Sequence, residues 1–178
     1  MDPWEQEEYR ALRATIRERG TARVWVFVSG LTAWAALVIA AVALASPPAA
    51  ALLPLLVLAA AFEGVFALHV GVERVGRYIQ VYLEEGRGGW EHVAMTFGSP
   101  RGAVSTDALF TVPFLLAALF NVTPALIAQP TAAELVFVGG AHALFVLRLL
   151  VARLAASRQR AIDLARFQEL RQQNPAKP

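Results

Sequence analysis

Four long apolar runs are the feature of this sequence that most restricts its fold. They occupy residues 24–45, 49–70, 109–128 and 132–152. A helix needs about 20 predominantly apolar residues to cross the hydrocarbon core of a bilayer. The whole chain is 57% apolar and 17% charged, whereas soluble domains are usually about 45–50% apolar and about 25% charged. We therefore expect an all-α integral membrane protein built as a bundle of four transmembrane helices.

Two short turns that contain proline divide the four runs into two helical hairpins. Ser46-Pro47-Pro48 separates the first run from the second, and Gln129-Pro130-Thr131 separates the third from the fourth. Proline ends a helix because it lacks an amide donor and collides with the preceding turn. Since both turns are short, we expect the two helices of each hairpin to be antiparallel neighbours.

The positions of arginine and lysine predict how the chain is threaded through the bilayer. All 16 of these residues lie in segments 1–23, 74–101 and 148–177, and neither short turn contains one. Segments rich in arginine and lysine face the cytoplasm in membrane proteins. We therefore expect both termini in the cytoplasm. The bias towards arginine and alanine is typical of GC-rich bacterial genomes, which predicts a location in the bacterial cytoplasmic (inner) membrane.

The first apolar run also has a second interpretation, as a cleaved signal peptide. Ala43-Leu44-Ala45 resembles the small-residue site of a signal peptidase. However, the preceding run exceeds the apolar core of about 7–15 residues that is usual in signal peptides, and two prolines follow the site at once. An uncleaved membrane anchor is the preferred interpretation.

Helical extensions are expected outside the four runs. Residues 1–22 should form an amphipathic helix, because Asp2 suits the N-cap and Glu5 completes a capping box, while Gly20 suits a stop. Residues 71–107 form a connector. In it the second helix should continue to about Glu85, and Trp90–Phe97 should form a short amphipathic helix. Ser105-Thr106-Asp107 should cap the third run, and the tail, residues 153–178, should extend the fourth helix.

Ionisable side chains within the apolar runs are candidates for function, because charge at membrane depth is costly. Counted from the outer turns at about 1.5 Å per residue, Glu63 lies roughly 18–21 Å deep and His142 roughly 15 Å deep. If the second and fourth helices are adjacent, these two side chains are placed to hydrogen-bond and to carry or sense a proton. The alternative is that each is neutral and bonds to a neighbouring helix.

Arg74 and Arg77 share one helical face with Glu63. One interpretation is that the two arginines line a polar cavity or bind an anionic headgroup. The other is that they are interfacial anchors whose side chains reach towards the headgroups. Four glycines predict close approach of helices. Gly64, Gly139 and Gly140 lie within the apolar runs, and Gly71 directly follows the second run.

A metal site is a further hypothesis, supported by two histidines and two carboxylates near the second run. His69 and Glu73 are one turn apart, and Glu91 and His92 lie in the connector, which could fold back towards them. Such ligands suit zinc, iron or manganese. The chain has no cysteine and three histidines in all, and it carries no ExxH or HExxH signature. No catalytic triad, phosphate loop or nucleotide fingerprint is present either, so an enzyme is the less favoured class.

Three functions from different classes fit these features. The first is an accessory or structural subunit of a membrane assembly or homo-oligomer. The second is an oligomeric small ion channel or proton-linked transporter, and the third is a metal-dependent membrane enzyme. No cofactor is predicted, and a bound lipid is compatible with the sequence. The expected partners are the lipid bilayer and further membrane proteins or copies of the chain. Nucleic acid is not an expected partner, because membrane topology already explains the basic residues.

Overall fold

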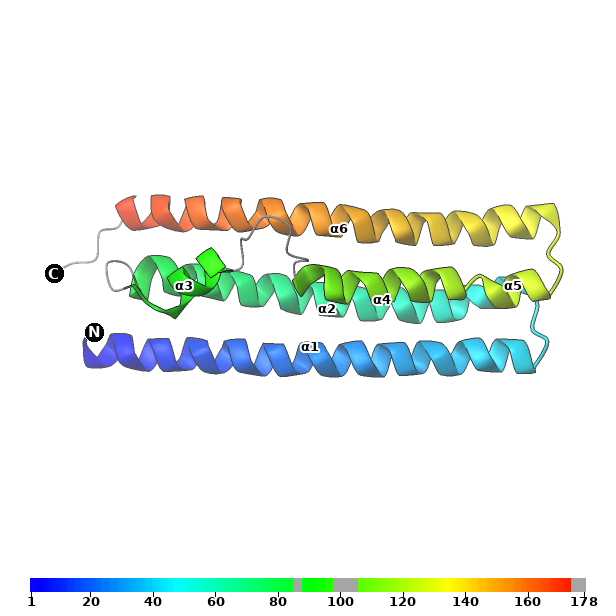
Figure 1. The fold of residues 1–178 in the computed structure, drawn as a ribbon, viewed down its shortest axis with the longest axis horizontal. Coiled ribbons are helices and arrows are strands. Elements are labelled where there is room, and N and C mark those ends of the chain that lie inside the picture. Colours follow the sequence, from blue (N-terminus) through cyan, green and yellow to red (C-terminus); the bar gives the residue numbers. More distant parts are fainter. Residues whose placement is uncertain (85–87, 98–105, 174–178) are drawn as a thin grey trace. The chain divides into compact units, whose positions relative to one another are not determined.

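The computed structural model describes residues 1–84, 88–97 and 106–173, and in these ranges it is helical without strands (Figure 1). Four helices are long and apolar enough to span a membrane. In chain order the elements are α1 (Pro3–Ala43), the 3₁₀ helix η1 (Pro48–Ala51), α2 (Leu52–Tyr78), the π-helix η2 (Ile79–Leu83), α3 (Trp90–Phe97), α4 (Thr106–Phe120), α5 (Thr123–Ile127) and α6 (Ala132–Gln173).

The chain divides into two compact units. Unit 1 comprises Met1–Ala22, Ala67–Ser105 and Leu154–Pro178, and unit 2 comprises Arg23–Phe66 and Thr106–Arg153. Unit 2 therefore holds nearly all of the four apolar runs, and unit 1 holds most of the arginine-rich segments.

Helix α1 begins as predicted but does not stop where predicted. The Glu5 amide donates to Asp2 Oδ1 at 2.7 Å, and the Asp2 amide donates to Glu5 Oε2 at 3.1 Å, so the expected capping box is confirmed. The expected stop at Gly20 is wrong, because α1 continues to Ala43. An isolated glycine costs a helix only about 1 kcal/mol, and the apolar run that follows it favours helix.

The C-terminal end of α1 is a hydrogen-bonded turn with a left-handed residue. The Ser46 amide donates to the Ala41 carbonyl at 3.0 Å, and the Ala45 amide donates to the Val42 carbonyl at 3.1 Å. These two bonds satisfy carbonyls that the end of a helix leaves without partners. Ala45 accordingly has φ of +46°, a conformation that glycine adopts at lower cost than alanine.

The third apolar run is divided into two helices, whereas the uninterrupted run of residues 109–128 predicts a single helix. Helix α4 ends at Phe120 and α5 begins at Thr123. Pro124 has no amide hydrogen and cannot donate to the carbonyl four residues earlier. Asn121 and Val122 therefore form the junction, where the Val122 amide donates to the Leu119 carbonyl at 3.4 Å. The cap expected at Ser105-Thr106-Asp107 lies outside the side chains that the structure describes.

The remaining helical extensions agree with prediction. Helix α2 and η2 together reach Leu83, close to the expected end near Glu85, and α3 covers the predicted short helix. Helix α6 begins after a second capping box, in which the Thr131 amide donates to Glu134 Oε2 at 2.9 Å. It then continues without a break to Gln173, so the predicted extension of the fourth helix is confirmed.

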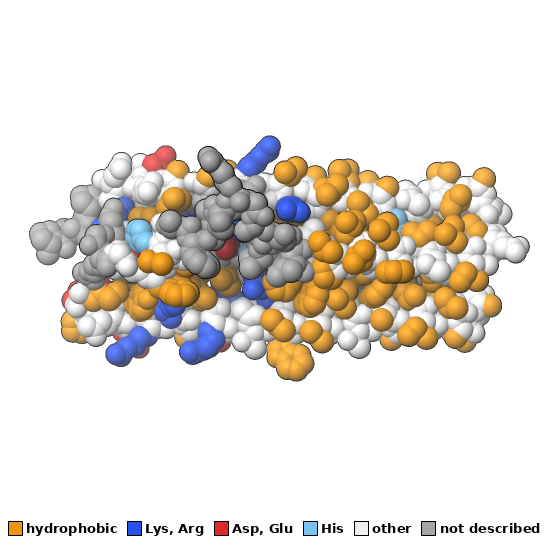
Figure 2. Space-filling model, in the orientation of Figure 1, with side chains coloured by type: hydrophobic (Ala, Val, Ile, Leu, Met, Phe, Trp, Pro, Cys, Tyr) orange, Lys and Arg blue, Asp and Glu red, His pale blue; other side chains and the backbone are white. Residues whose placement is uncertain are grey.

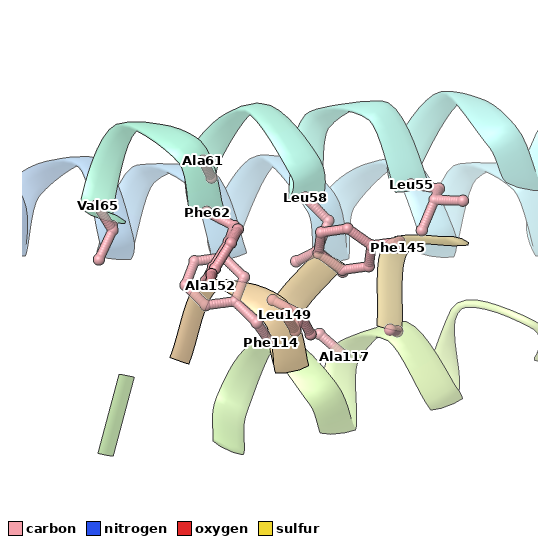
Figure 3. Close-up of a cluster of buried hydrophobic side chains, with 11 residues drawn as sticks. Leu55, Leu58, Ala61, Phe62, Val65, Phe114, Ala117, Phe145, Leu149 and Ala152 are labelled. Atoms are coloured by element: carbon pink, nitrogen blue, oxygen red, sulfur yellow. The ribbon is translucent and has the colours of Figure 1, made fainter. Parts of the chain in front are cut away.

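The core of unit 2 is apolar and rich in aromatic rings (Figure 3). The ring of Phe62 meets those of Phe114 and Phe145 edge to face, with centroids 5.4 and 6.2 Å apart. Leu58 and Leu149 are fully buried beside them. The visible face of unit 2 is covered largely by hydrophobic side chains (Figure 2). A contiguous apolar surface of this kind is typical of regions that contact lipid or another protein.

Glycine allows two helices of unit 2 to approach closely. A Cβ atom built on Gly30 of α1 would collide with the Cβ of Ala61 of α2, and one built on Gly64 would lie 3.1 Å from Val26 Cγ1. At Gly139 and Gly140 of α6, no atom of the described residues lies within 4 Å of such a Cβ atom. The predicted role in close approach is thus seen for Gly64, while Gly30 has the same role and was not singled out from the sequence.

Candidate functional site

A buried polar network links the four apolar runs of unit 2. Asn121, at the junction between α4 and α5, is fully buried. Its Oδ1 accepts from Trp34 Nε1 of α1 at 3.0 Å. Its Nδ2 donates to the Ala51 carbonyl of η1 at 2.8 Å and lies 2.9 Å from His142 Nε2 of α6. One amide therefore has partners from every other apolar run.

The donors and acceptors of this network can be assigned from chemistry. An indole N–H only donates and a carbonyl only accepts, so the Asn121 amide must present oxygen to Trp34 and nitrogen to Ala51. His142 Nδ1 lies 2.7 Å from the Val138 carbonyl and therefore carries the proton. His142 Nε2 then accepts from Asn121. The arrangement requires a neutral histidine with its proton on Nδ1, and each polar group in it has a partner.

Glu63 and His142 have different partners in the structure. Glu63 Oε2 accepts from Arg148 Nη2 of α6 at 2.8 Å. The side chains of Glu63 and Arg148 are 48% and 40% exposed, so this ion pair lies on the surface of unit 2 rather than in its core. The Arg148 guanidinium also lies 5.3 Å from the ring centroid of Phe66. The network around His142 and the pair at Glu63 are thus separate features.

Unit 1 contains a small pocket between α2 and α6 with charged walls. Its polar lining residues are His69, Glu73 and Arg77 of α2 together with Gln159, Arg160 and Asp163 of α6. Arg77 Nη2 lies 3.3 Å from Glu73 Oε2, and Arg160 Nε lies 3.1 Å from the same oxygen. Two guanidinium groups therefore share one carboxylate.

The other groups of the pocket are held by further polar contacts. Arg160 Nη2 lies 3.4 Å from His69 Nε2. Asp163 accepts from Gln159 Nε2 at 2.8 Å and from Arg74 Nε at 3.2 Å. Arg74 is thus half exposed and paired, whereas Arg77 is buried. Burial lowers the pKa of Arg77, since the low dielectric disfavours its charge, although Glu73 opposes this change.

Glu91 and His92 belong to a second charged cluster of unit 1, around α3. Arg13 Nη1 donates to Glu91 Oε1 at 2.5 Å. Buried Glu84 accepts from the Glu91 amide at 2.8 Å, and Glu84 Oε2 lies 3.8 Å from His92 Nδ1. Burial raises the pKa of Glu91, an effect that Arg13 opposes and Glu84 reinforces.

The structure does not bring the four predicted metal ligands together. His69 and Glu73 lie with the arginines of the α2–α6 pocket, and Glu91 and His92 lie in the cluster around α3. Within residues 1–84, 88–97 and 106–173, no three histidine or carboxylate side chains are arranged to hold a metal ion. The geometry of these four residues is that of ion pairs and hydrogen bonds.

Asn121, Arg160 and Asp163 are among the residues of these sites that were not singled out from the sequence. Asn121 could have been found, because an amide side chain within an apolar run must have a partner. Arg160 and Asp163 carried no such signal, since they lie among the many charges of the tail.

Comparison with protein-family models, with characterised proteins and with solved structures gives no match.

Proposed function

We propose that this chain is a structural subunit of a membrane assembly in the bacterial cytoplasmic membrane, with both termini in the cytoplasm. It works by holding helices together, either with further copies of itself or with another membrane protein. The observation that carries the proposal is the network of Asn121, whose polar atoms are all used to connect α1, η1 and α6.

The polar side chains of unit 2 hold helices together, which favours a structural role over transport of a solute. A solute path needs polar groups that face a water-filled space. The two buried polar side chains in the described part of unit 2 are Asn121 and His142, and they bond to each other. The rest of the buried cluster consists of leucine, alanine, phenylalanine and valine.

The exposed ion pair supports assembly with a partner. Two charged side chains at membrane depth are costly when they face lipid, yet Glu63 and Arg148 lie on the surface of unit 2. A helix of a partner packed over them would remove both from lipid. Helix α1 gives further support. In its most apolar stretch 6% is buried, against 39% for α2, so most of this apolar surface of α1 is open to a partner.

The mass of the protein purified in a mild detergent tests this proposal. We expect an oligomer or a complex with a partner in fixed ratio, measured by light scattering after correction for detergent. Replacing both charges, in Glu63→Leu with Arg148→Leu, should change the oligomer distribution, while Leu144→Ala on the exposed face of α6 should leave it unchanged.

Two results contradict the proposal. The first is a monomer without a partner across several mild detergents. The second is ion flux into reconstituted vesicles that Glu63→Gln abolishes, which would favour the channel alternative.

A further inference from the structure

The α2–α6 pocket of unit 1 is lined by two guanidinium groups and two carboxylates, and a third guanidinium group, that of Arg74, lies beside it. Arg77 and Arg160 share the Glu73 carboxylate, and Arg74 pairs with Asp163. Three guanidinium groups thus meet two carboxylates. The proximity of Arg77 and Arg160 is itself unfavourable, because each positive charge opposes the other.

The chemistry of the walls fits one anionic group of low charge. Guanidinium groups bind phosphate oxygens through short, charge-assisted hydrogen bonds. Glu73 and Asp163 would repel a dianion more strongly than a monoanion, and Arg74, which pairs with Asp163 from outside the lining, brings the local balance to one positive charge. A phosphodiester carries one negative charge, and the amide of Gln159 adds a donor on the same wall.

The position of the pocket in the sequence points to a lipid as the source of this group. His69 and Val70 are the last two residues of the second apolar run, and both line the pocket. A pocket directly after a membrane span lies at the level of the headgroups. Val70 and Ala156 provide apolar surface next to the charged groups.

We propose that this pocket binds a singly charged phosphate group, namely the phosphodiester of a phospholipid headgroup. Arg160 is the main ligand, since its side chain is 30% exposed and borders the pocket, and Arg77 lies deeper. The inference depends on membrane insertion but not on the proposed assembly, because the lining residues come from one chain.

Lipid titration of the full chain in detergent tests the proposal. Native mass spectrometry and thermal unfolding would be followed with phosphatidylglycerol, phosphatidylethanolamine, diacylglycerol and inorganic phosphate. We expect both phospholipids to bind and to raise the melting temperature, and diacylglycerol, which lacks phosphate, to do neither. Binding of inorganic phosphate with equal strength would identify free phosphate as the source of the group.

Two substitutions should change binding in opposite directions. Arg160→Gln removes a ligand and should weaken binding by at least about tenfold, the loss expected for one charged hydrogen bond. Glu73→Gln frees both guanidinium groups and should strengthen it. Arg158→Gln is the control. It also removes one positive charge, at an exposed position two residues away on α6, and so it measures how far unspecific attraction between the protein and anionic lipid contributes to binding.

The opposite signs keep the test decisive if one variant folds poorly. A general loss of structure would weaken binding in both variants, whereas Glu73→Gln should strengthen it. The proposal is overturned if diacylglycerol binds as well as the phospholipids. It is also overturned if neither Arg160→Gln nor Glu73→Gln differs from Arg158→Gln.

Discussion

Asn121 Nδ2 lies 2.9 Å from His142 Nε2, and this contact joins the junction of the third apolar run to the middle of the fourth. The Trp34 indole fixes the orientation of the amide, and the Val138 carbonyl fixes the proton of the histidine on Nδ1. Each group in the chain of bonds therefore determines the state of the next one, so that a change at one position affects the others.

Replacing Asn121 by leucine should destabilise unit 2. The substitution keeps the branching and the number of heavy atoms of the side chain but leaves the Trp34 indole, the Ala51 carbonyl and His142 Nε2 without this partner. We expect a loss of about 1–4 kcal/mol, since polar contacts in membranes average about 0.6 kcal/mol and buried unpaired groups cost more. Equilibrium unfolding in mixed detergent micelles measures this loss.

Thr123→Val is the matched control for that substitution, because Thr123 is exposed two residues further along. It should change the free energy of unfolding by less than about 0.5 kcal/mol. Equal stability of the two variants would show that the network of Asn121 contributes nothing to the fold.

Gly30→Ala should separate α1 from α2 and lower stability. The new methyl group would collide with the Cβ of Ala61, and overpacking of this kind costs about 1–3 kcal/mol. Gly140→Ala is the control, because within the described part of the chain no atom lies within 4 Å of the new methyl group. It should raise stability slightly, as alanine favours helix over glycine by up to about 1 kcal/mol. Thermal unfolding of both variants measures the two changes in stability. An increase in stability for Gly30→Ala would contradict the close approach of α1 and α2.

Ala45→Gly should stabilise the first hairpin. Ala45 has φ of +46°, where the Cβ atom of an L-residue costs about 1–2 kcal/mol and glycine has no such cost. Part of this gain is lost because glycine is more flexible in the unfolded chain. We expect a net increase of about 0.5–1 kcal/mol in the free energy of unfolding. Ala43→Gly, within α1, should have the opposite effect, and a decrease in both variants would contradict the turn geometry.

Stability should depend on pH through Glu91. Burial raises its pKa above the ordinary value of 4.5 in the folded chain, so the folded state holds the proton more tightly than the unfolded state. Its stabilising contribution is complete below the unfolded pKa, near 4.5, and is lost as pH rises through the folded pKa. We therefore expect the free energy of unfolding to fall over the window that begins near pH 4.5 and extends upwards.

Unfolding of wild type and Glu91→Gln between pH 4 and 8 measures this contribution. The variant should lose the fall in stability across that window, because glutamine does not titrate. Glu7→Gln, at an exposed glutamate of α1, should retain it. If both variants follow wild type, the burial of Glu91 has no energetic effect.

The sequence predicted those parts of the fold that depend on local signals. Apolar length located the helices, and the pairs Asp2–Glu5 and Thr131–Glu134 mark helix starts by capping chemistry that acts over three residues. The division of the third apolar run into two helices at Asn121 was not predicted, although Pro124 favours a helix break there. The stop predicted at Gly20 is absent from α1, since one glycine does not end a helix that an apolar run follows.

The contacts between helices could not be predicted in the same way. Whether Glu63 meets His142 or Arg148 depends on the rotation of α2 and α6 about their axes. That rotation is set by packing around rings such as Phe62, not by spacing along the chain. Arg148 was assigned to a basic cytoplasmic segment on charge alone, and its pairing with Glu63 appears only once both helices have a fixed orientation.

The indole of Trp34 also makes the network of Asn121 visible to fluorescence. The chain has four tryptophans, and the side chains of Trp4, Trp25 and Trp90 are 63–77% exposed, so a dissolved quencher or a lipid-borne one reaches them. Trp34 Nε1, in contrast, donates to the amide of buried Asn121. With the other three replaced by phenylalanine, its emission wavelength would follow loosening of that amide in real time, without any attached dye.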